Sequence, residues 1–221
     1  MQGVRAAAVL IATLVLVGSA LAASGTSIRT LSSSEVGAVR AAHEYHAGCP
    51  VPPAQLRLLT VRYMGFDHRS HWGALVVNAR VAAGLARVFE ELYAQRFPIH
   101  HMQFGDTYGT LKNIPRDGDF TASFECRQAS ASPCTKTNGT TGSWSEHAYG
   151  EAIDLNPVEN PYVGCGMTRD ATALSYLNRS RHRRGMVDAA VVRAFASIGW
   201  GWGGSWSGST QDYMHFSING H

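Results

Sequence analysis

The stretch from residue 145 to residue 154, SEHAYGEAID, constrains this chain more than any other part of its sequence. It places His147 and Asp154 seven residues apart, and on one unbroken strand an odd spacing points two side chains to opposite faces of a sheet. The two side chains can reach a common point only if the chain turns between them, and Gly150 permits such a turn. Residues 152–155 then read as a short strand that carries Asp154. A polar turn with no further role is the simpler alternative.

A second acid and a second histidine follow near the end of the sequence, in the pattern Asp212-Tyr-Met-His215. Imidazoles from His147 and His215 and the carboxylate of Asp154 can occupy three corners of a zinc tetrahedron. The fourth corner would be left for water or substrate, and Asp212 would be free to act as a base. The sequence therefore predicts one zinc ion per chain, with an ordinary buried histidine as the alternative explanation.

The two motifs together resemble those of the D-alanyl-D-alanine carboxypeptidase and dipeptidase family of bacterial zinc peptidases. That family includes vancomycin-resistance carboxypeptidases and L-alanyl-D-glutamate endopeptidases. The pattern S-x-H-x-x-G-x-A-x-D followed by acid-x-x-His is matched here by Ser145, His147, Gly150, Ala152, Asp154, Asp212 and His215. The likeness runs from about residue 48 to residue 216. It implies the α+β fold shared with Hedgehog signalling domains, a small antiparallel sheet with packed helices.

The resemblance also implies catalytic roles. Zinc at the three ligands would lower the pKa of its water to about 7, and Asp212 would take that proton and pass it to the leaving amine. Arg127 is the match for an arginine that the family uses near the scissile carbonyl or the substrate carboxylate, where a guanidinium supplies paired donors. Glu146 and Glu151 are alternative bases, although neither has the position that the family pattern expects.

Several further residues are expected at the substrate. Ser145 would orient the loop or the substrate, because no base pairs with it as a nucleophile requires. Trp202 and Trp206 lie in a glycine-rich loop that we expect to border the site. Residues 105–143 are the least regular stretch, and long loops in compact domains are often functional. This loop contains Arg127, and we expect it to form a substrate-binding wall to which Asp106 and Tyr108 contribute.

The first residues predict export. Residues 1–22 combine a basic start, an apolar core and the small-x-small sequence Ala20-Leu-Ala22, which is typical of a signal peptide. The apolar run is short for a membrane span, and an uncleaved anchor is the alternative. Residues 23–47 are expected to form a helical extension that begins at the capping box Ser32-Ser-Ser-Glu35. Residues 48–221 would then be the catalytic domain of a secreted protein, in the cell wall or the periplasm.

The charge limits the classes of binding partner that we expect, and the cysteine content indicates disulfides. The excess of 19 Lys and Arg over 16 Asp and Glu is too small to suggest a nucleic-acid surface. We expect a monomer with no stable membrane association after cleavage. Four cysteines in an exported chain suggest disulfides, with three possible pairings. The resemblance favours Cys49 with Cys126 and Cys134 with Cys165, and the local pair Cys126 with Cys134 is the competitor.

The remaining pattern predicts an α+β domain. A hairpin is expected from residues 56–66 and 73–78, followed by a helix that Asn78 caps and that ends near residue 96. A strand at 99–104, a helix at 187–198 and a final strand at 213–217 complete the domain. His100 and His101 are expected to be strand residues and not ligands.

These features predict a secreted zinc metallopeptidase that hydrolyses peptide bonds in peptidoglycan stem peptides. D-alanyl-D-alanine carboxypeptidase activity is the first expectation, and L-alanyl-D-glutamate endopeptidase activity is the alternative, because both reactions use the same constellation. A wall-binding module that keeps zinc only for structure is a third possibility. The intact Asp212 argues against that possibility, because a structural zinc site needs no free carboxylate.

Overall fold

A computed structural model of the protein describes residues 25–135 and 138–221. The expected signal peptide, residues 1–22, lies outside the described residues. The described chain has the predicted α+β architecture, although its strands are divided among four small sheets instead of one. None of the helices in the described ranges is long and apolar enough to span a bilayer.

The regular elements follow one another in mixed order along the chain. The strands are β1 Ser27–Thr30, β2 Leu56–Gly65, β3 Ser70–Asn78, β4 Pro98–Ile99, β5 Gln128–Ser130, β6 Thr140–Trp144, β7 Ala152–Asp154, β8 Tyr162–Gly164, β9 Gly201–Trp202, β10 Thr210–Asp212 and β11 His215–Ser217. The α-helices are α1 Ser33–Ala41, α2 Ala82–Ala94, α3 Phe104–Tyr108 and α4 Ala189–Ala196. The 3₁₀ turns are η1 Pro53–Gln55, η2 Glu146–Tyr149, η3 Ala171–Tyr176 and η4 Gly203–Ser205.

The predicted hairpin is confirmed as the long pair β2 and β3, which run antiparallel from the Leu56↔Asn78 pair to the Met64↔Ser70 pair. β1 adds to the free edge of β2, so the segment expected to be a helical extension also supplies a strand to the main sheet. β4 pairs with the far end of β2 in parallel. The apolar face of α2 covers this sheet with residues that are at most 1% exposed, namely Leu85, Val88, Phe89 and Leu92.

The prediction that Asn78 caps α2 is wrong. β3 keeps Asn78 in its ladder as the partner of Leu56, and the Asn78 amide donates to the carbonyl of Tyr149 over 2.9 Å. The helix begins at Ala82, and its N-cap residue Val81 makes no side-chain cap. The capping box at the start of α1 is confirmed: the Ser32 hydroxyl accepts from the backbone N–H of Glu35, and the Glu35 carboxylate accepts from the backbone N–H of Ser32.

A second layer carries the end of the chain. β11 lies between β7 and β9, and α4 packs beneath them through the stacked rings of Phe195 and Phe216, whose centroids are 3.9 Å apart. Asp188 caps α4, with its carboxylate accepting from the N–H groups of Ala190 and Val191. The strand expected at 213–217 begins only at His215. The strand before it, β10, pairs with β8 in a different sheet. The strand expected at 99–104 ends at Ile99, and the short helix α3 follows it.

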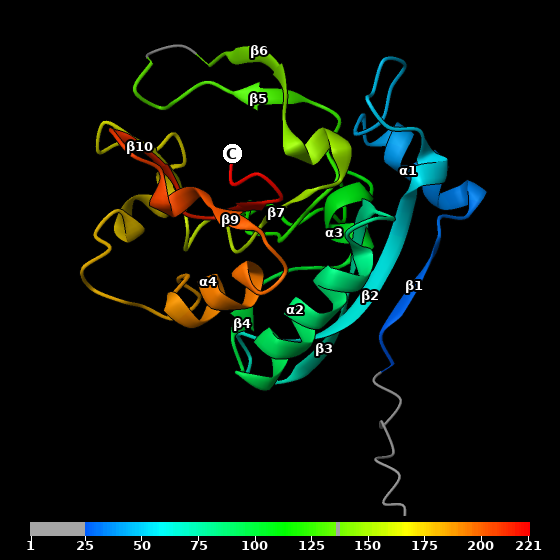
Figure 1. Ribbon diagram of the computed structural model, residues 1–221, viewed down its shortest axis with the longest axis horizontal. Helices are drawn as coiled ribbons and strands as arrows, with labels where there is room; N and C mark the ends of the chain where they lie inside the picture. Colours follow the sequence, from blue (N-terminus) through cyan, green and yellow to red (C-terminus); the bar gives the residue numbers. More distant parts are fainter. Residues whose placement is uncertain (1–24, 136–137) are drawn as a thin grey trace, which may run out of the picture.

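Both disulfides agree with the favoured pairing. Cys49 bonds Cys126 and Cys134 bonds Cys165, so all four cysteines are paired. The first joins the turn after α1 to the segment before β5, and the second joins the loop after β5 to the end of β8. In Figure 1 the β5–β6 hairpin lies at the top, α2 and α4 lie at the bottom, and the C-terminal end lies between them. The candidate site is built around this end of the chain.

Candidate metal centre

The predicted turn between the two halves of the first motif is present. Ser145 caps η2 with a hydroxyl that accepts from the backbone N–H of His147 over 3.3 Å. Gly150 ends η2 in the left-handed region at φ 69°, and a Cβ there would lie 2.8 Å from the backbone nitrogen of Asn78. Glycine is therefore needed both for its conformation and for the close approach of β3. The chain leaves this turn directly into β7, which carries Asp154.

Sheet pairing brings the second histidine to the first motif. β11 runs antiparallel to β7, and His215 is the register partner of Asp154. The Asp154 oxygen Oδ1 lies 3.1 Å from His147 Nε2 and 3.2 Å from His215 Nδ1. The two histidine nitrogens are 3.2 Å apart. The three predicted ligands therefore present one atom each at the corners of a nearly equilateral triangle.

This triangle fits a tetrahedral zinc site. Zinc bound to nitrogen or carboxylate oxygen at 2.0–2.2 Å separates neighbouring ligand atoms by about 3.3 Å. The remaining ring nitrogens are held by the backbone: His147 Nδ1 lies 2.5 Å from the carbonyl oxygen of Ser123, and His215 Nε2 lies 3.2 Å from the backbone oxygen of His221. A ring N–H that donates to a carbonyl leaves a lone pair on the opposite nitrogen. Two lone pairs and a carboxylate oxygen thus converge where a cation would sit.

Burial and charge act on the same triad. His147 is 1% exposed and His215 is 6% exposed. Burial by itself lowers the pKa of His147, but the charge of Asp154 and its hydrogen bond outweigh burial and raise that pKa. Burial opposes ionisation of Asp154, and the two histidines more than compensate, so the pKa of Asp154 is held well below its usual range. Asp154 therefore stays ionised and available as a ligand.

Asp212 is a second carboxylate in the same cavity. It is the last residue of β10, opposite Tyr162 on β8. Its Oδ1 atom is buried, and no group of the described residues hydrogen-bonds to that atom. Burial first and the charge of Asp154 second raise the pKa of Asp212 to about 7. A carboxyl group poised near neutral pH can take up and release a proton under working conditions.

Arg127 approaches the centre from the segment that leads into β5. Its Nε donates to Glu125 over 2.7 Å, and its terminal Nη2 lies 4.0 Å from Asp154 Oδ2. Burial lowers the pKa of the Arg127 guanidinium, but the charges of Glu125 and Asp154 outweigh burial and raise it. The side chain is 38% exposed, so a charged fork faces the cavity beside the triad.

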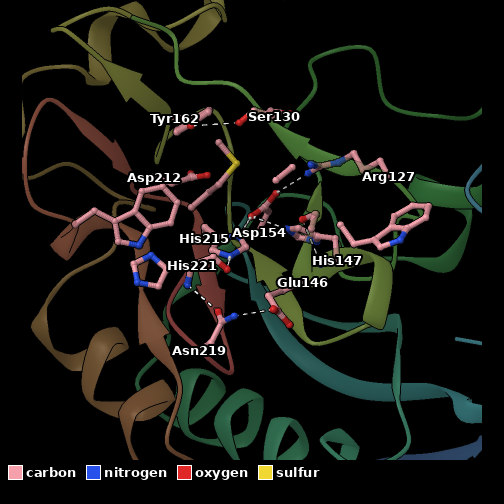
Figure 2. A pocket seen from close by; sticks show the side chains of 15 residues that line it. Arg127, Ser130, Glu146, His147, Asp154, Tyr162, Asp212, His215, Asn219 and His221 are labelled. Atoms are coloured by element: carbon pink, nitrogen blue, oxygen red, sulfur yellow. Dashed lines mark hydrogen bonds and ion pairs between the residues drawn. The ribbon is translucent and has the colours of Figure 1, made fainter. Parts of the chain in front are cut away.

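The cavity around these groups has a volume of about 400 Å³. Figure 2 shows the triad at its centre, with Arg127 and Asp212 on either side. Its lining combines the metal-site residues with aromatic and polar side chains: Arg127, Ala129, Ser130, Trp144, Ser145, Glu146, His147, Asp154, Tyr162, Trp206, Asp212, Met214, His215, Asn219 and His221.

Two of the residues expected at the substrate lie elsewhere. Trp202 does not line this cavity, because its indole packs against Phe216 and donates to the carbonyl of Tyr213 over 2.9 Å. Tyr108 is a core residue whose hydroxyl donates to the carbonyl of Phe124.

The other residue expected in the wall and one of the alternative bases also form bonds within the protein. Asp106 accepts from the backbone N–H of Gln103 at the start of α3. Glu151, one of the alternative bases, is buried and paired with Arg80. The other alternative, Glu146, does line the cavity and accepts from the Asn219 amide over 2.6 Å.

Several lining residues were not predicted from the sequence. Tyr162 enters because β8 pairs with β10, and its ring meets Trp206 edge-on at 6.4 Å. Asn219 and His221 enter because the chain after β11 folds back over the centre. Such side chains carry no motif of their own, and only their strand register and tertiary contacts identify them.

Comparison with known proteins gives one family. The family model described as D-alanyl-D-alanine carboxypeptidase matches residues 138–218. A search of curated proteins and a search of solved structures found no significant match. The matched segment contains the whole triad and Asp212 but not Arg127. Over these residues the chain is similar to D-alanyl-D-alanine carboxypeptidases. This similarity supports the prediction that the protein is a peptidase.

Proposed function

We propose that this protein is a zinc-dependent peptidase that is exported from the cell and hydrolyses peptide bonds in peptidoglycan stem peptides. The proposed bond is the one between two terminal D-alanine residues. The described residues contain two disulfides, which are typical of proteins in oxidising compartments outside the cytoplasm. The similarity over residues 138–218 supports the wall-peptide substrate.

One observation carries the proposal: a three-ligand site beside a buried carboxylate oxygen that has no partner in the described part of the chain. Structural zinc sites are closed by four protein ligands, whereas catalytic sites use three and keep one position open. Here the described residues supply His147, Asp154 and His215, and the cavity in front of them also contains Asp212. A centre that served only to hold the fold together would not require the free Asp212 Oδ1.

When bound to the triad, zinc would polarise the peptide carbonyl and favour deprotonation of a water molecule. Asp212 accepts that proton, because burial keeps its pKa near 7 and no group of the described residues engages its Oδ1 atom. The same carboxyl then delivers the proton to the nitrogen of the leaving amino acid. His147 and His215 are kept in the required tautomers by the backbone oxygens that accept from their second nitrogens.

Arg127 holds the substrate. Its guanidinium can bind a carbonyl oxygen or a terminal carboxylate with two parallel hydrogen bonds. Glu125 fixes the Nε side of this group over 2.7 Å, which leaves the terminal nitrogens for the substrate. Tyr162 and Trp206 form an aromatic wall on the side of Asp212, so of the two tryptophans expected to border the site only Trp206 takes that role.

The deciding experiment is digestion of defined muropeptides followed by mass spectrometry of the products. A stem pentapeptide that ends in two D-alanines should lose one alanine, and a chelator should stop the reaction until zinc is restored. Asp188→Asn is the matched control for acid-to-amide changes, because Asp188 caps α4 away from the cavity and asparagine also caps helices.

Each other outcome has a clear meaning. Release of L-alanine from the peptide would establish the endopeptidase reaction and disprove the proposed bond. Zinc binding without cleavage of any wall peptide would indicate a binding module. Cleavage that persists in the metal-free protein would contradict the proposed chemistry as a whole.

A further inference from the structure

A second group of histidine and aspartate side chains lies outside the cavity. His100 follows β4 directly, and His101 forms a bridge with Phe120, so the end of β4 runs beside the segment that contains Asp117 and Asp119. The backbone N–H of Thr121 donates to the carbonyl of His101 over 2.8 Å and fixes this alignment. Two parts of the chain that are separated in sequence are thereby brought together.

The side chains of this group bring three possible metal-ligand atoms close together. One nitrogen from each of His100 and His101 and one carboxylate oxygen of Asp117 lie within 4.8 Å of one another. His101 Nε2 is 3.0 Å from Asp117 Oδ2, which is close to the ligand separation of about 3.3 Å in a tetrahedral site. The two imidazole rings are stacked, with centroids 4.7 Å apart and planes 16° apart.

A buried carboxylate orients the first of these histidines. The Asp119 side chain is 2% exposed, and its Oδ2 atom accepts from His100 Nδ1. The other oxygen, Oδ1, accepts from the backbone N–H of Val158 over 3.2 Å, so Asp119 is held in place. Because a carboxylate accepts from Nδ1, the lone pair of His100 is left on Nε2, and we assign that nitrogen to the metal. A carboxylate behind a ligating histidine is the usual second partner of such residues at zinc sites.

The backbone of the same histidine is also fixed. The amide oxygen of Asn156 accepts from the backbone N–H of His100 over 3.1 Å, and the amide nitrogen of Asn156 donates to the carbonyls of Pro98 and Gly185. Asn156 is fully buried. The group therefore has a positioned ligand and is not a chance meeting of mobile surface side chains.

We propose that His100, His101 and Asp117 form a second metal site that takes zinc or a similar divalent transition metal, with water completing the coordination. Two imidazoles and one carboxylate suit this class of ion better than calcium or magnesium, which prefer oxygen. A third group of possible ligands, His46 with Cys49 and Cys126, offers no such site, because its two sulfurs form a disulfide.

The second site has a structural consequence. A metal there would tie the end of β4 to the segment at 117–120. That segment leads directly to Ala122, which forms a bridge with Asp154 of the first centre. The ion would therefore stabilise the segment that pairs with Asp154, a ligand of the first centre, without entering the cavity. This inference does not depend on the proposed peptidase reaction.

The test is zinc stoichiometry of the full chain after equilibrium dialysis against zinc chloride, measured by elemental analysis. We expect two zinc ions per chain for the unchanged protein and one for His101→Ala. The control is His71→Ala: His71 forms an exposed pair with Asp67 over 2.9 Å, but no third ligand joins them among the described groups. That variant should still bind two ions.

A more conservative variant separates the loss of a metal ligand from a loss of folding. In Asp117→Asn the amide oxygen can still accept from the backbone N–H of Asp119, as Asp117 Oδ1 does over 3.2 Å, but the ligand charge is lost. This variant should keep its melting temperature without zinc, and its affinity for the second ion should fall at least about tenfold. If the unchanged protein and His101→Ala each bind one zinc ion, the proposal is overturned. If the unchanged protein binds one zinc ion and His101→Ala binds none, the result supports the second site and contradicts the first.

Discussion

The two histidine–aspartate triads of this protein have the same donor set and very different surroundings. In the first, the side chains of His147, Asp154 and His215 are 1%, 15% and 7% exposed. In the second, the corresponding exposures of His100, His101 and Asp117 are 38%, 33% and 46%. Donor identity alone therefore does not distinguish a catalytic centre from a surface site.

Burial raises the free-energy cost of a triad that binds no cation. Lone pairs that converge in a buried site lose water and gain no partner, so only a cation or a proton relieves them. The exposed triad can hydrate its donors instead, and its net gain from a metal is correspondingly smaller. We therefore expect tight binding at the first triad and weak binding at the second.

The neighbouring carboxylates differ as well. At the exposed triad both oxygens of Asp119 are engaged, one by His100 and the other by Val158. At the buried triad Asp212 lines the cavity, and its buried Oδ1 atom has no partner among the described residues. Asp212 beside the first triad is thus free to exchange protons, whereas Asp119 beside the second is held at both oxygens.

The largest expected effect comes from removing one ligand of each triad. His215→Ala should abolish peptidase activity and binding of the tight zinc, whereas His101→Ala should keep full activity. Zinc at about a thousand times its dissociation constant stabilises a protein by about 4 kcal/mol, and each kcal/mol shifts the melting temperature of a domain of this size by roughly 2–4 °C. Melting curves with and without chelator should show this loss for His215→Ala, and an active His215→Ala protein would contradict the assignment of the first triad as the catalytic centre.

The next effect tests the free carboxylate. Asp212→Asn preserves size but cannot accept a proton in the same way, so turnover should fall by roughly 10²–10⁴-fold. Zinc content should stay normal because Asp212 is not a ligand, and substrate affinity should change much less than turnover. Kinetics and elemental analysis of the same preparation measure both. Loss of zinc would place Asp212 among the ligands, and near-normal turnover would shift the base to Glu146.

A smaller effect is expected at the guanidinium. Arg127→Lys keeps the charge and loses the planar fork, so both KM and kcat should worsen. The loss of one charge-assisted hydrogen bond, about 1.5–3 kcal/mol, corresponds to a fall in kcat/KM on the order of 10- to 100-fold. Arg193→Lys on the exposed face of α4 is the control and should behave as the unchanged protein. An unchanged KM in Arg127→Lys would show that Arg127 does not hold the substrate.

The smallest effect is a pH dependence of the stabilisation by zinc. The raised pKa of His147 means that the metal-free fold gains stability from a bound proton. This gain is complete below the unfolded value of about 6.5 and is lost as pH rises through the folded pKa. Zinc must displace that proton, so the difference in melting temperature between zinc-bound and metal-free protein should grow as pH rises from about 5 to 8. A difference that shrinks over this range would contradict the assignment of His147 as a ligand.

Local patterns predicted much of the fold and of the first triad. The hairpin of β2 and β3 follows from runs of β-branched and aromatic residues, and the start of α1 follows from its capping box. Gly150 was predicted to turn the chain, and it does so in the left-handed region. The helix start and the turn depend on interactions within a few residues, and the hairpin joins two strands that follow one another in the chain, so a sequence pattern records all three.

Other predictions failed where distant segments compete. Asn78 has the chemistry of a helix cap, but β2 holds it in a strand. Trp202 and Trp206 are alike in sequence, yet packing against Phe216 draws Trp202 away from the cavity. His100 and His101 were expected in a strand, but β4 ends at Ile99 and both histidines lie beyond it, beside Asp117.

The sequence by itself determined the donor types, the turn that allows His147 and Asp154 to meet, and the acid near His215. Tertiary structure alone decided which donors are buried, which tautomers the histidines adopt and which carboxylate stays free. The physical reason is that donor chemistry and turn conformation are properties of single residues and their neighbours. Burial and hydrogen-bond partners arise only when separate strands, here β7, β10 and β11, are brought together.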